Sequence, residues 1–241
     1  MSDWCFITIL NMNRIRKELQ KKGDKERVKA LSHFFKTGEG QYGEGDVFLG
    51  IKVPIQREIV EMFKEASLFE IQELIDDKIH ECRLTGLLIL VQKYKKAENK
   101  KEIFDFYLKN TKKINNWDLV DLTAPNIIGD FLLDKKKERE ILYSLAKSKN
   151  LWERRIAILS TFTFLREKQF KDTLEISKIL LKDEHDLIHK AVGWMLRELG
   201  KRDKNIEVDF LKKYCKIMPR TMLRYAIEKF NQKERASFMK K

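Results

Sequence analysis

Proline, glycine and cysteine are all scarce in this sequence of 241 residues. It contains three prolines and ten glycines, and four of the glycines lie between residues 38 and 45. Because proline and glycine interrupt regular helices, their scarcity elsewhere allows long helical stretches. The three cysteines (Cys5, Cys82 and Cys215) are too few and too far apart for a disulfide framework, which favours a reducing compartment.

The sequence also lacks a metal-binding cluster and a membrane-spanning run. His185 and His189 are four residues apart, but no third ligand is near them in sequence, so we expect no metal and no cofactor. Residues 4–10 are mostly apolar, yet this run is too short to cross a bilayer and makes a poor signal peptide. We therefore expect a cytoplasmic protein without a membrane partner, in which residues 1–11 form an N-terminal extension.

Basic residues outnumber acidic ones. Lys and Arg total 50 against 37 Asp and Glu, which gives a formal net charge of +13. Such a surplus favours binding to a polyanion, chiefly nucleic acid or an anionic surface. The alternative is a soluble protein whose Lys content reflects a Lys-rich proteome.

Apolar residues recur at helical spacing along most of the chain, and strict alternation is nearly absent. Such stretches include residues 103–107, 142–146, 156–165 and 187–196. The pattern predicts an all-α protein of about a dozen short helices joined by polar links.

An internal repeat predicts the architecture. Five helical segments carry a charged residue before small and apolar ones, at positions 83, 121, 155, 190 and 224, with intervals of 38, 34, 35 and 34 residues. Repeated helical hairpins have about this period. We therefore predict that residues 12–241 form a single domain, a superhelical solenoid of stacked helical hairpins with one repeat position lining a ridge on its concave face.

That ridge would be basic except at one position. It carries Arg83, Arg155, Lys190 and Arg224, with Asp121 among them. Regularly spaced cations suit a phosphate backbone. In the alternative interpretation, these cations cap helices or form ion pairs within the bundle.

Asp121 admits two interpretations. A carboxylate facing phosphates is unfavourable for binding alone, but it would stabilise the sugar cation that develops when a glycosidic bond breaks, or position the attacking water. It could instead be a structural residue paired with Arg155 one repeat away. Trp117, four residues before Asp121, and Trp194, four residues after Lys190, could hold a deoxyribose and a cationic base.

Five motifs occur in order along the chain, at residues 48–54 (FLGIKVP), 116–121 (NWDLVD), 151–159 (LWERRIAIL), 190–198 (KAVGWMLRE) and 218–224 (MPRTMLR). Through these motifs the sequence resembles the AlkD family of DNA alkylation-repair glycosylases, from about residue 12 to 238.

The resemblance implies HEAT-like repeats around double-stranded DNA, and release of N3- or N7-alkylated purines without a deep base pocket. It implies that Asp121 is the catalytic carboxylate, that Trp117 and Trp194 frame the sugar of the lesion, and that Arg155 holds the carboxylate and the DNA backbone. No Lys is placed as a Schiff-base nucleophile, so we expect a monofunctional enzyme of base excision repair, acting as a monomer.

The sequence departs from the family near its N-terminus. A Tyr that one member places against the lesion's backbone is replaced here by an aromatic residue without a hydroxyl, which we assign to Phe34. Residues 38–46 match the letters of G-x-G-x-x-G, but they lack a preceding strand and carry three acids, so they predict a turn-rich loop with Tyr42 near the DNA rather than a dinucleotide site. Two alternatives remain: a non-catalytic binder of branched or damaged DNA, and a protein scaffold.

Overall fold

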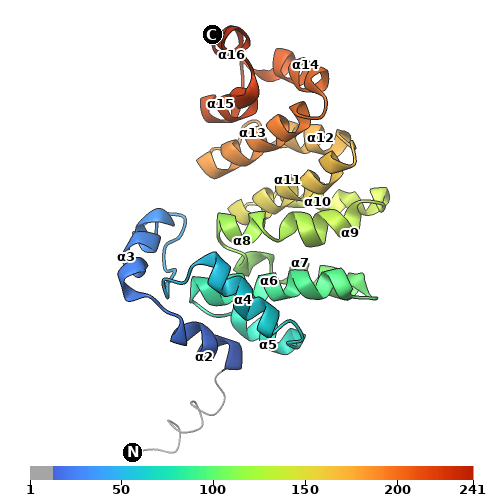
Figure 1. The fold of residues 1–241 in the computed structure, drawn as a ribbon. Coiled ribbons are helices and arrows are strands. Elements are labelled where there is room, and N and C mark those ends of the chain that lie inside the picture. The colour runs from blue at the N-terminus through green and yellow to red at the C-terminus, as the bar shows by residue number, and fades with distance from the viewer. Residues whose placement is uncertain (1–12, 241) are drawn as a thin grey trace, which may run out of the picture. The chain divides into compact units, whose positions relative to one another are not determined.

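The computed structural model describes residues 13–240 and is helical throughout its regular elements (Figure 1). The β-pairing within this range is an isolated parallel bridge between Val47 and Ile79. None of the helices described is long and apolar enough to cross a bilayer. The predicted N-terminal extension, residues 1–11, lies outside the described residues. The all-α prediction is confirmed.

The chain divides into two compact units, Met1–Leu119 and Val120–Lys241. Their boundary falls inside the short helix α8 (Trp117–Asp121), so Trp117 belongs to the first unit and Asp121 to the second. The two units are described separately below.

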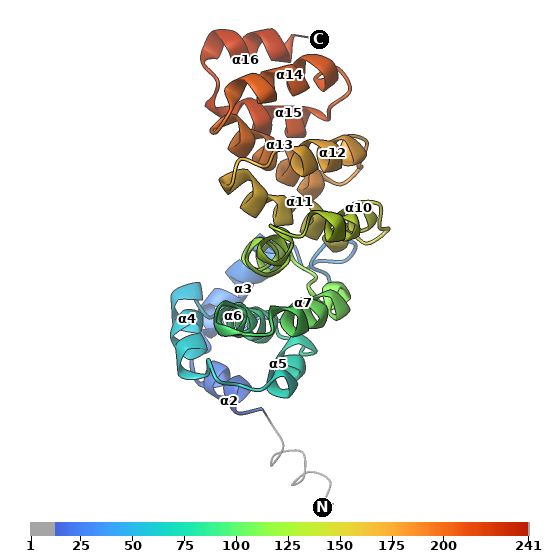
Figure 2. The same cartoon turned by 90° about the vertical axis from the view of Figure 1, so that its right-hand side faces the viewer.

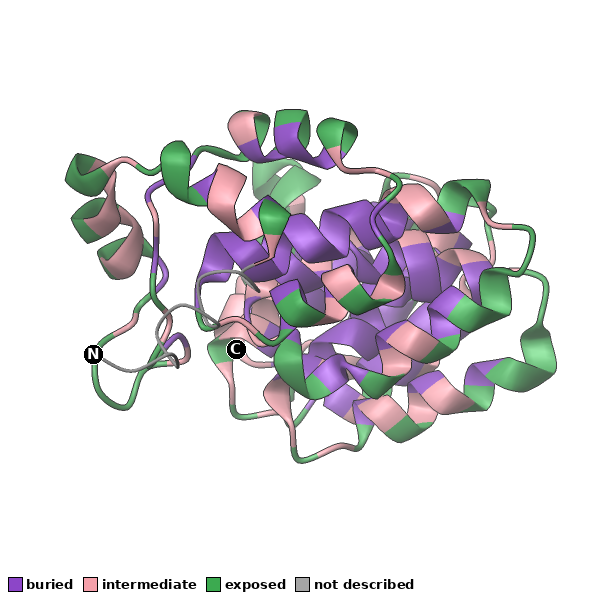
Figure 3. Ribbon diagram, turned by 90° about the horizontal axis from the view of Figure 1, so that it is seen from below, coloured by how far each residue is buried: buried purple, intermediate pink, exposed green. Residues whose placement is uncertain are grey.

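In the first unit, α6 (His80–Lys96) is the central helix. Its residues from His80 to Val91 are all buried, as expected of a helix that is covered on every side. Four helices pack on it: α2 (Arg14–Lys21), α4 (Val53–Met62), α5 (Leu68–Ile75) and α7 (Lys100–Lys109). The remaining elements are α3 (Lys25–Phe34) and the short turn η1 (Thr111–Lys113). Long buried stretches of this kind are purple in Figure 3.

The second unit is built from three consecutive helical hairpins. They are α10 (Glu140–Ala146) with α11 (Leu151–Arg166), α12 (Lys171–Leu180) with α13 (Asp186–Gly200), and α14 (Lys204–Tyr214) with α15 (Arg220–Ala226). The second helices pack on one another in the order α11, α13, α15, which can be followed in Figure 2. The other elements are η2 (Pro125–Gly129), α9 (Asp130–Leu132), η3 (Lys136–Arg139), η4 (Ile227–Lys229) and α16 (Gln232–Met239).

Three of the five repeat positions predicted from the sequence fall on equivalent helices of the second unit. Arg155, Lys190 and Arg224 lie on α11, α13 and α15, the second helices of successive hairpins. Gly193 allows α13 and α15 to approach closely, because a Cβ atom there would lie 2.5 Å from the Met222 carbonyl oxygen. The predicted stacking of helical hairpins is therefore confirmed.

Candidate functional site

Asp121 and Arg155 form a bidentate ion pair in the second unit. Arg155 donates from Nε to Oδ1 of Asp121 and from Nη2 to Oδ2, both at 2.8 Å. Its Nη1 donates to the carbonyl oxygen of Leu187 at 2.6 Å. One guanidinium thus joins the end of α8 to α11 and to the first turn of α13. Planar fork-to-carboxylate geometry is the strong form of charge-assisted pairing.

The ion pair is largely shielded from water. The Arg155 side chain is 6% exposed and that of Asp121 is 14% exposed. Arg155 is placed by the start of α11, where the side chain of Asn150 caps the helix by accepting the N–H groups of Trp152 and Glu153. Because both carboxylate oxygens are held by one rigid group, Asp121 presents its exposed edge in a fixed orientation.

Trp117 is clamped by aromatic residues of the first unit. Its ring stacks on Phe35 with 5.4 Å between ring centroids and meets Phe34 edge-on at 5.9 Å. Phe35 in turn stacks on Phe48 at 5.1 Å. Phe35 and Phe48 are buried, whereas Phe34 is 61% exposed. We call Phe34, Phe35, Phe48 and Trp117 the aromatic wall.

A buried charged cluster lies behind the aromatic wall. The ring of His80 packs against Phe35 and Phe48, both at 4.8 Å between centroids. Its Nε2 is 2.8 Å from Oδ2 of Asp118, and its Nδ1 is 3.3 Å from Oδ2 of Asp46. These interactions link α6 to the start of α8 and to the end of residues 38–46, which we call the Gly-rich loop.

Electrostatics favour the charged form of His80. Burial alone would lower its pKa, but the charge of Asp118 and the hydrogen bonds to Asp118 and Asp46 outweigh burial and raise the pKa to about 9. Burial alone would raise the pKa of Asp46, but the hydrogen bond from His80 and the charge of Arg83 hold it below its usual value. The raised pKa therefore favours an imidazolium at position 80 that donates to both Asp118 and Asp46.

The cations predicted to bind phosphate differ in their surroundings. Arg83 is buried and donates to Asp46 at 2.6 Å and to the Asp77 carbonyl oxygen at 2.9 Å. Lys190 is half-buried and paired with Asp186 at 2.7 Å, while Arg224 is exposed. Arg83 is thus paired within the protein, as in the alternative interpretation in which the cations of the ridge form ion pairs within the bundle. A phosphate role for Lys190 and Arg224 stays a prediction.

Trp194 lies against α11 in the second unit. Its ring is 6.1 Å from that of Phe162, and the Arg166 guanidinium lies over the same Phe162 ring at 4.4 Å. The Arg202 guanidinium is 5.8 Å from that ring centroid. No motif in the sequence predicts these aromatic and cationic neighbours of Trp194. The framing role predicted for Trp117 and Trp194 stays a prediction.

The Gly-rich loop is a turn-rich segment, as its composition indicates, and carries Tyr42 half-buried. The Nζ atom of Lys36 lies 6.0 Å from the Tyr42 ring centroid. The loop returns on itself, because the N–H of Gly43 donates to the Lys36 carbonyl oxygen at 3.1 Å. At its far end, the carboxylate of Glu81 accepts the N–H groups of residues 49–51. The predicted contact of Tyr42 with DNA is untested.

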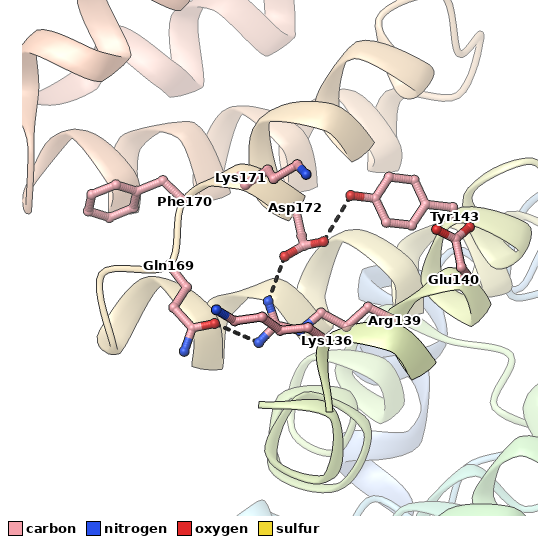
Figure 4. Close-up of a pocket in the computed structure, with 8 residues that line it drawn as sticks. All are labelled: Lys136, Arg139, Glu140, Tyr143, Gln169, Phe170, Lys171 and Asp172. Atoms are coloured by element: carbon pink, nitrogen blue, oxygen red, sulfur yellow. Dashed lines mark hydrogen bonds and ion pairs between the residues drawn. The ribbon is translucent and has the colours of Figure 1, made fainter. Parts of the chain in front are cut away.

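A pocket of about 430 Å³ lies between α10 and α12 of the second unit (Figure 4). Arg139 donates to Asp172 at 2.7 Å and to Gln169 at 2.6 Å, and the Tyr143 hydroxyl donates to Asp172 at 2.8 Å. These hydrogen bonds join the two sides of the pocket to each other. Among residues 13–240, no three His, Cys, Asp or Glu side chains gather as a metal site would require.

Sequence reasoning missed the buried cluster around His80. Asp118 and Asn116 lie in the NWDLVD motif, but the sequence alone gives no sign that they face inward. Asn116 donates to Asp46 at 3.2 Å and accepts the N–H of Trp117 at 2.8 Å. The signal available in the sequence was the polar residue on each side of Trp117, namely Asn116 and Asp118.

Comparisons with known proteins agree with the resemblance seen in the sequence. A family described as DNA alkylation repair enzyme matches residues 15–230. No curated protein sequence matches significantly. A solved structure described as a predicted DNA alkylation repair enzyme from Enterococcus faecalis shares the fold, with a TM-score of 0.72 at 18% identity, covering 88% of this chain and 98% of that one. Because the family match extends over both units, the chain belongs to the DNA alkylation repair enzyme family.

Proposed function

We propose that the protein is a monofunctional DNA glycosylase that releases N3- and N7-alkylated purines from duplex DNA in base excision repair. The observation that carries the proposal is the bidentate Asp121–Arg155 pair, which holds a partly exposed carboxylate in a fixed orientation. Membership of the DNA alkylation repair enzyme family supports alkylated DNA as the class of substrate.

The proposed chemistry is hydrolysis of the bond between the base and C1′ of the sugar. An alkylated purine is already cationic, so its departure leaves positive charge on the sugar ring. Asp121 stabilises that charge or orients the water that attacks C1′, and the products are a free base and an abasic site. Because the carboxylate is preorganised by Arg155, it need not reorient as charge develops.

Trp117 and Trp194 supply aromatic faces for the sugar and the cationic base. Trp117 is held edge-on by an exposed Phe34, so an aromatic surface is available to solvent in the first unit. Lys190 and Arg224 supply charge for the DNA backbone. We further propose that the protein acts as a monomer in the cytoplasm and associates with the nucleoid when DNA is bound.

The second candidate is a non-catalytic protein that binds branched or damaged DNA. The same ion pair favours it, because an Asp engaged by a buried Arg can serve structure alone. The two candidates agree on the DNA partner and differ on whether Asp121 takes part in chemistry.

One experiment separates them. The purified protein is incubated with methylated duplex DNA, and free 7-methylguanine and 3-methyladenine are measured with Asp121→Asn as the matched variant. The proposal expects release well above the spontaneous rate for the wild type and its loss in the variant, with DNA binding retained. Wild-type release at the spontaneous rate, with binding intact, would favour the non-catalytic candidate.

A further inference from the structure

We propose that His80 is a positioning residue that holds Trp117 in the orientation used to receive a damaged nucleotide. This inference rests on the proposed function, because it assigns Trp117 a role with the substrate. It concerns a residue of the first unit that is buried and that no motif singled out. His80 acts through its neighbours and does not touch DNA.

Two connections run from His80 to Trp117. The first is polar: Nε2 of His80 is bonded to Asp118, the residue directly after Trp117. The second is apolar: the imidazole ring lies against Phe35, on which the Trp117 indole stacks with an interplanar angle of 18°. The main chain of Trp117 and its side chain are therefore both supported by one imidazolium.

His80 also holds the loop that connects two residues of the aromatic wall. Through Asp46 it holds the end of the Gly-rich loop, which separates Phe35 from Phe48 in sequence although their rings stack. The backbone N–H of His80 adds a second connection, because it donates to the carbonyl oxygen of Val47 at 2.8 Å. The side chain and the backbone of His80 thereby hold the same end of the loop, at Asp46 and Val47.

The charges around His80 balance one another. Asp46 on the loop and Asp118 on α8 face the two ring nitrogens, and Arg83 on α6 shares Asp46. Asn116 also donates to Asp46. Two buried carboxylates and two buried cations form a closed network, and removal of the central cation leaves both carboxylates short of a donor. We expect α8 and the loop end to shift when this happens.

The test uses variants of His80, Asp118 and Trp117 and one control. His80→Gln removes the ring and the charge, and Asp118→Asn keeps the side-chain volume if His80→Gln folds poorly. Trp117→Ala removes the side chain that His80 is proposed to hold in position. The control is Asn110→Ala, which breaks another buried polar contact of the first unit, the paired bonds with Gln72 at 2.8 and 3.0 Å.

The first readout does not depend on activity. The protein is labelled with 5-fluorotryptophan, and the Trp117 signal is assigned by its absence in Trp117→Phe. We expect His80→Gln, or Asp118→Asn in its place, to shift or broaden the Trp117 resonance and to leave that of Trp194 unchanged, while Asn110→Ala changes neither. An unchanged Trp117 resonance in a folded His80 variant would overturn the proposal, even if the protein proved to have no glycosylase activity.

The second readout is the single-turnover rate of base release at saturating protein, with the Kd for DNA measured separately. A misplacement of about 1 Å can cost on the order of a hundredfold in rate, so we expect His80→Gln to slow release at least tenfold with Kd within about twofold. The double variant with Trp117→Ala should be no slower than Trp117→Ala alone. Additive losses would show that His80 does not act through Trp117.

Discussion

The Asp121–Arg155 pair offers the sharpest quantitative test of the second unit. We consider Arg155→Met, which keeps most of the length of the side chain and removes the guanidinium. The change takes away two 2.8 Å bonds to Asp121 and one bond to the Leu187 carbonyl oxygen. It leaves a carboxylate whose side chain is only 14% exposed.

The magnitude follows from burial and geometry. Breaking a buried ion pair from one side costs about 3–5 kcal/mol, and a hydrogen bond to a charged group is worth about 1.5–3 kcal/mol. Because water can reach part of Asp121, we expect the lower end, a loss of about 3 kcal/mol in the free energy of unfolding of the second unit. With a urea m-value of about 1.5 kcal/mol/M, the midpoint should fall by about 2 M.

The assay is a double-mutant cycle of Arg155→Met and Asp121→Asn, followed by urea unfolding. Trp152 and Trp194 report on the second unit, and transitions of the two units are fitted separately because two-state behaviour is not assumed. We expect a coupling energy of about 2 kcal/mol. The control, Lys190→Met, breaks a more exposed pair with Asp186 and should cost under about 1 kcal/mol. A coupling below about 0.5 kcal/mol would refute the view that Arg155 holds the carboxylate.

Three further predictions concern His80, Gly193 and the basic residues Arg224 and Arg83. Since the folded pKa of His80 is raised from 6.5 to about 9, its stabilisation is complete below pH 6.5 and is lost as the pH rises to 9; urea unfolding of the first unit at pH 6 and 9 should show this loss, and His80→Gln should remove the pH dependence of that unit's transition. Gly193→Ala would place a Cβ against the backbone of α15 and should destabilise the second unit by about 1–3 kcal/mol, measured by thermal unfolding; an unchanged Tm would contradict the close packing. Arg224→Gln should reduce the slope of log K for DNA against log salt by about 0.9, whereas Arg83→Met should lower stability without a change in slope.

Local sequence patterns were sufficient for much of the fold. Helical periodicity and the shortage of proline and glycine predict an all-α chain, since these signals depend on neighbouring residues alone. The repeat interval also places Arg155, Lys190 and Arg224 on equivalent helices, because each hairpin needs about the same length of chain. The pairing of Asp121 with Arg155 could be considered from the sequence for the same reason, because the two residues are one repeat apart.

The partners of the other charged residues could not be predicted from the repeat interval. Arg83 has the same sequence signature as Arg155, yet it is buried against Asp46, a residue of the Gly-rich loop 37 positions away. His80 has no local pattern at all, and its two carboxylate partners come from segments before and after it. By itself, the sequence determined the helices, their repeat and the positive charge. Only the tertiary structure decided which charges face inward, because burial and pairing depend on segments that meet only when the chain folds.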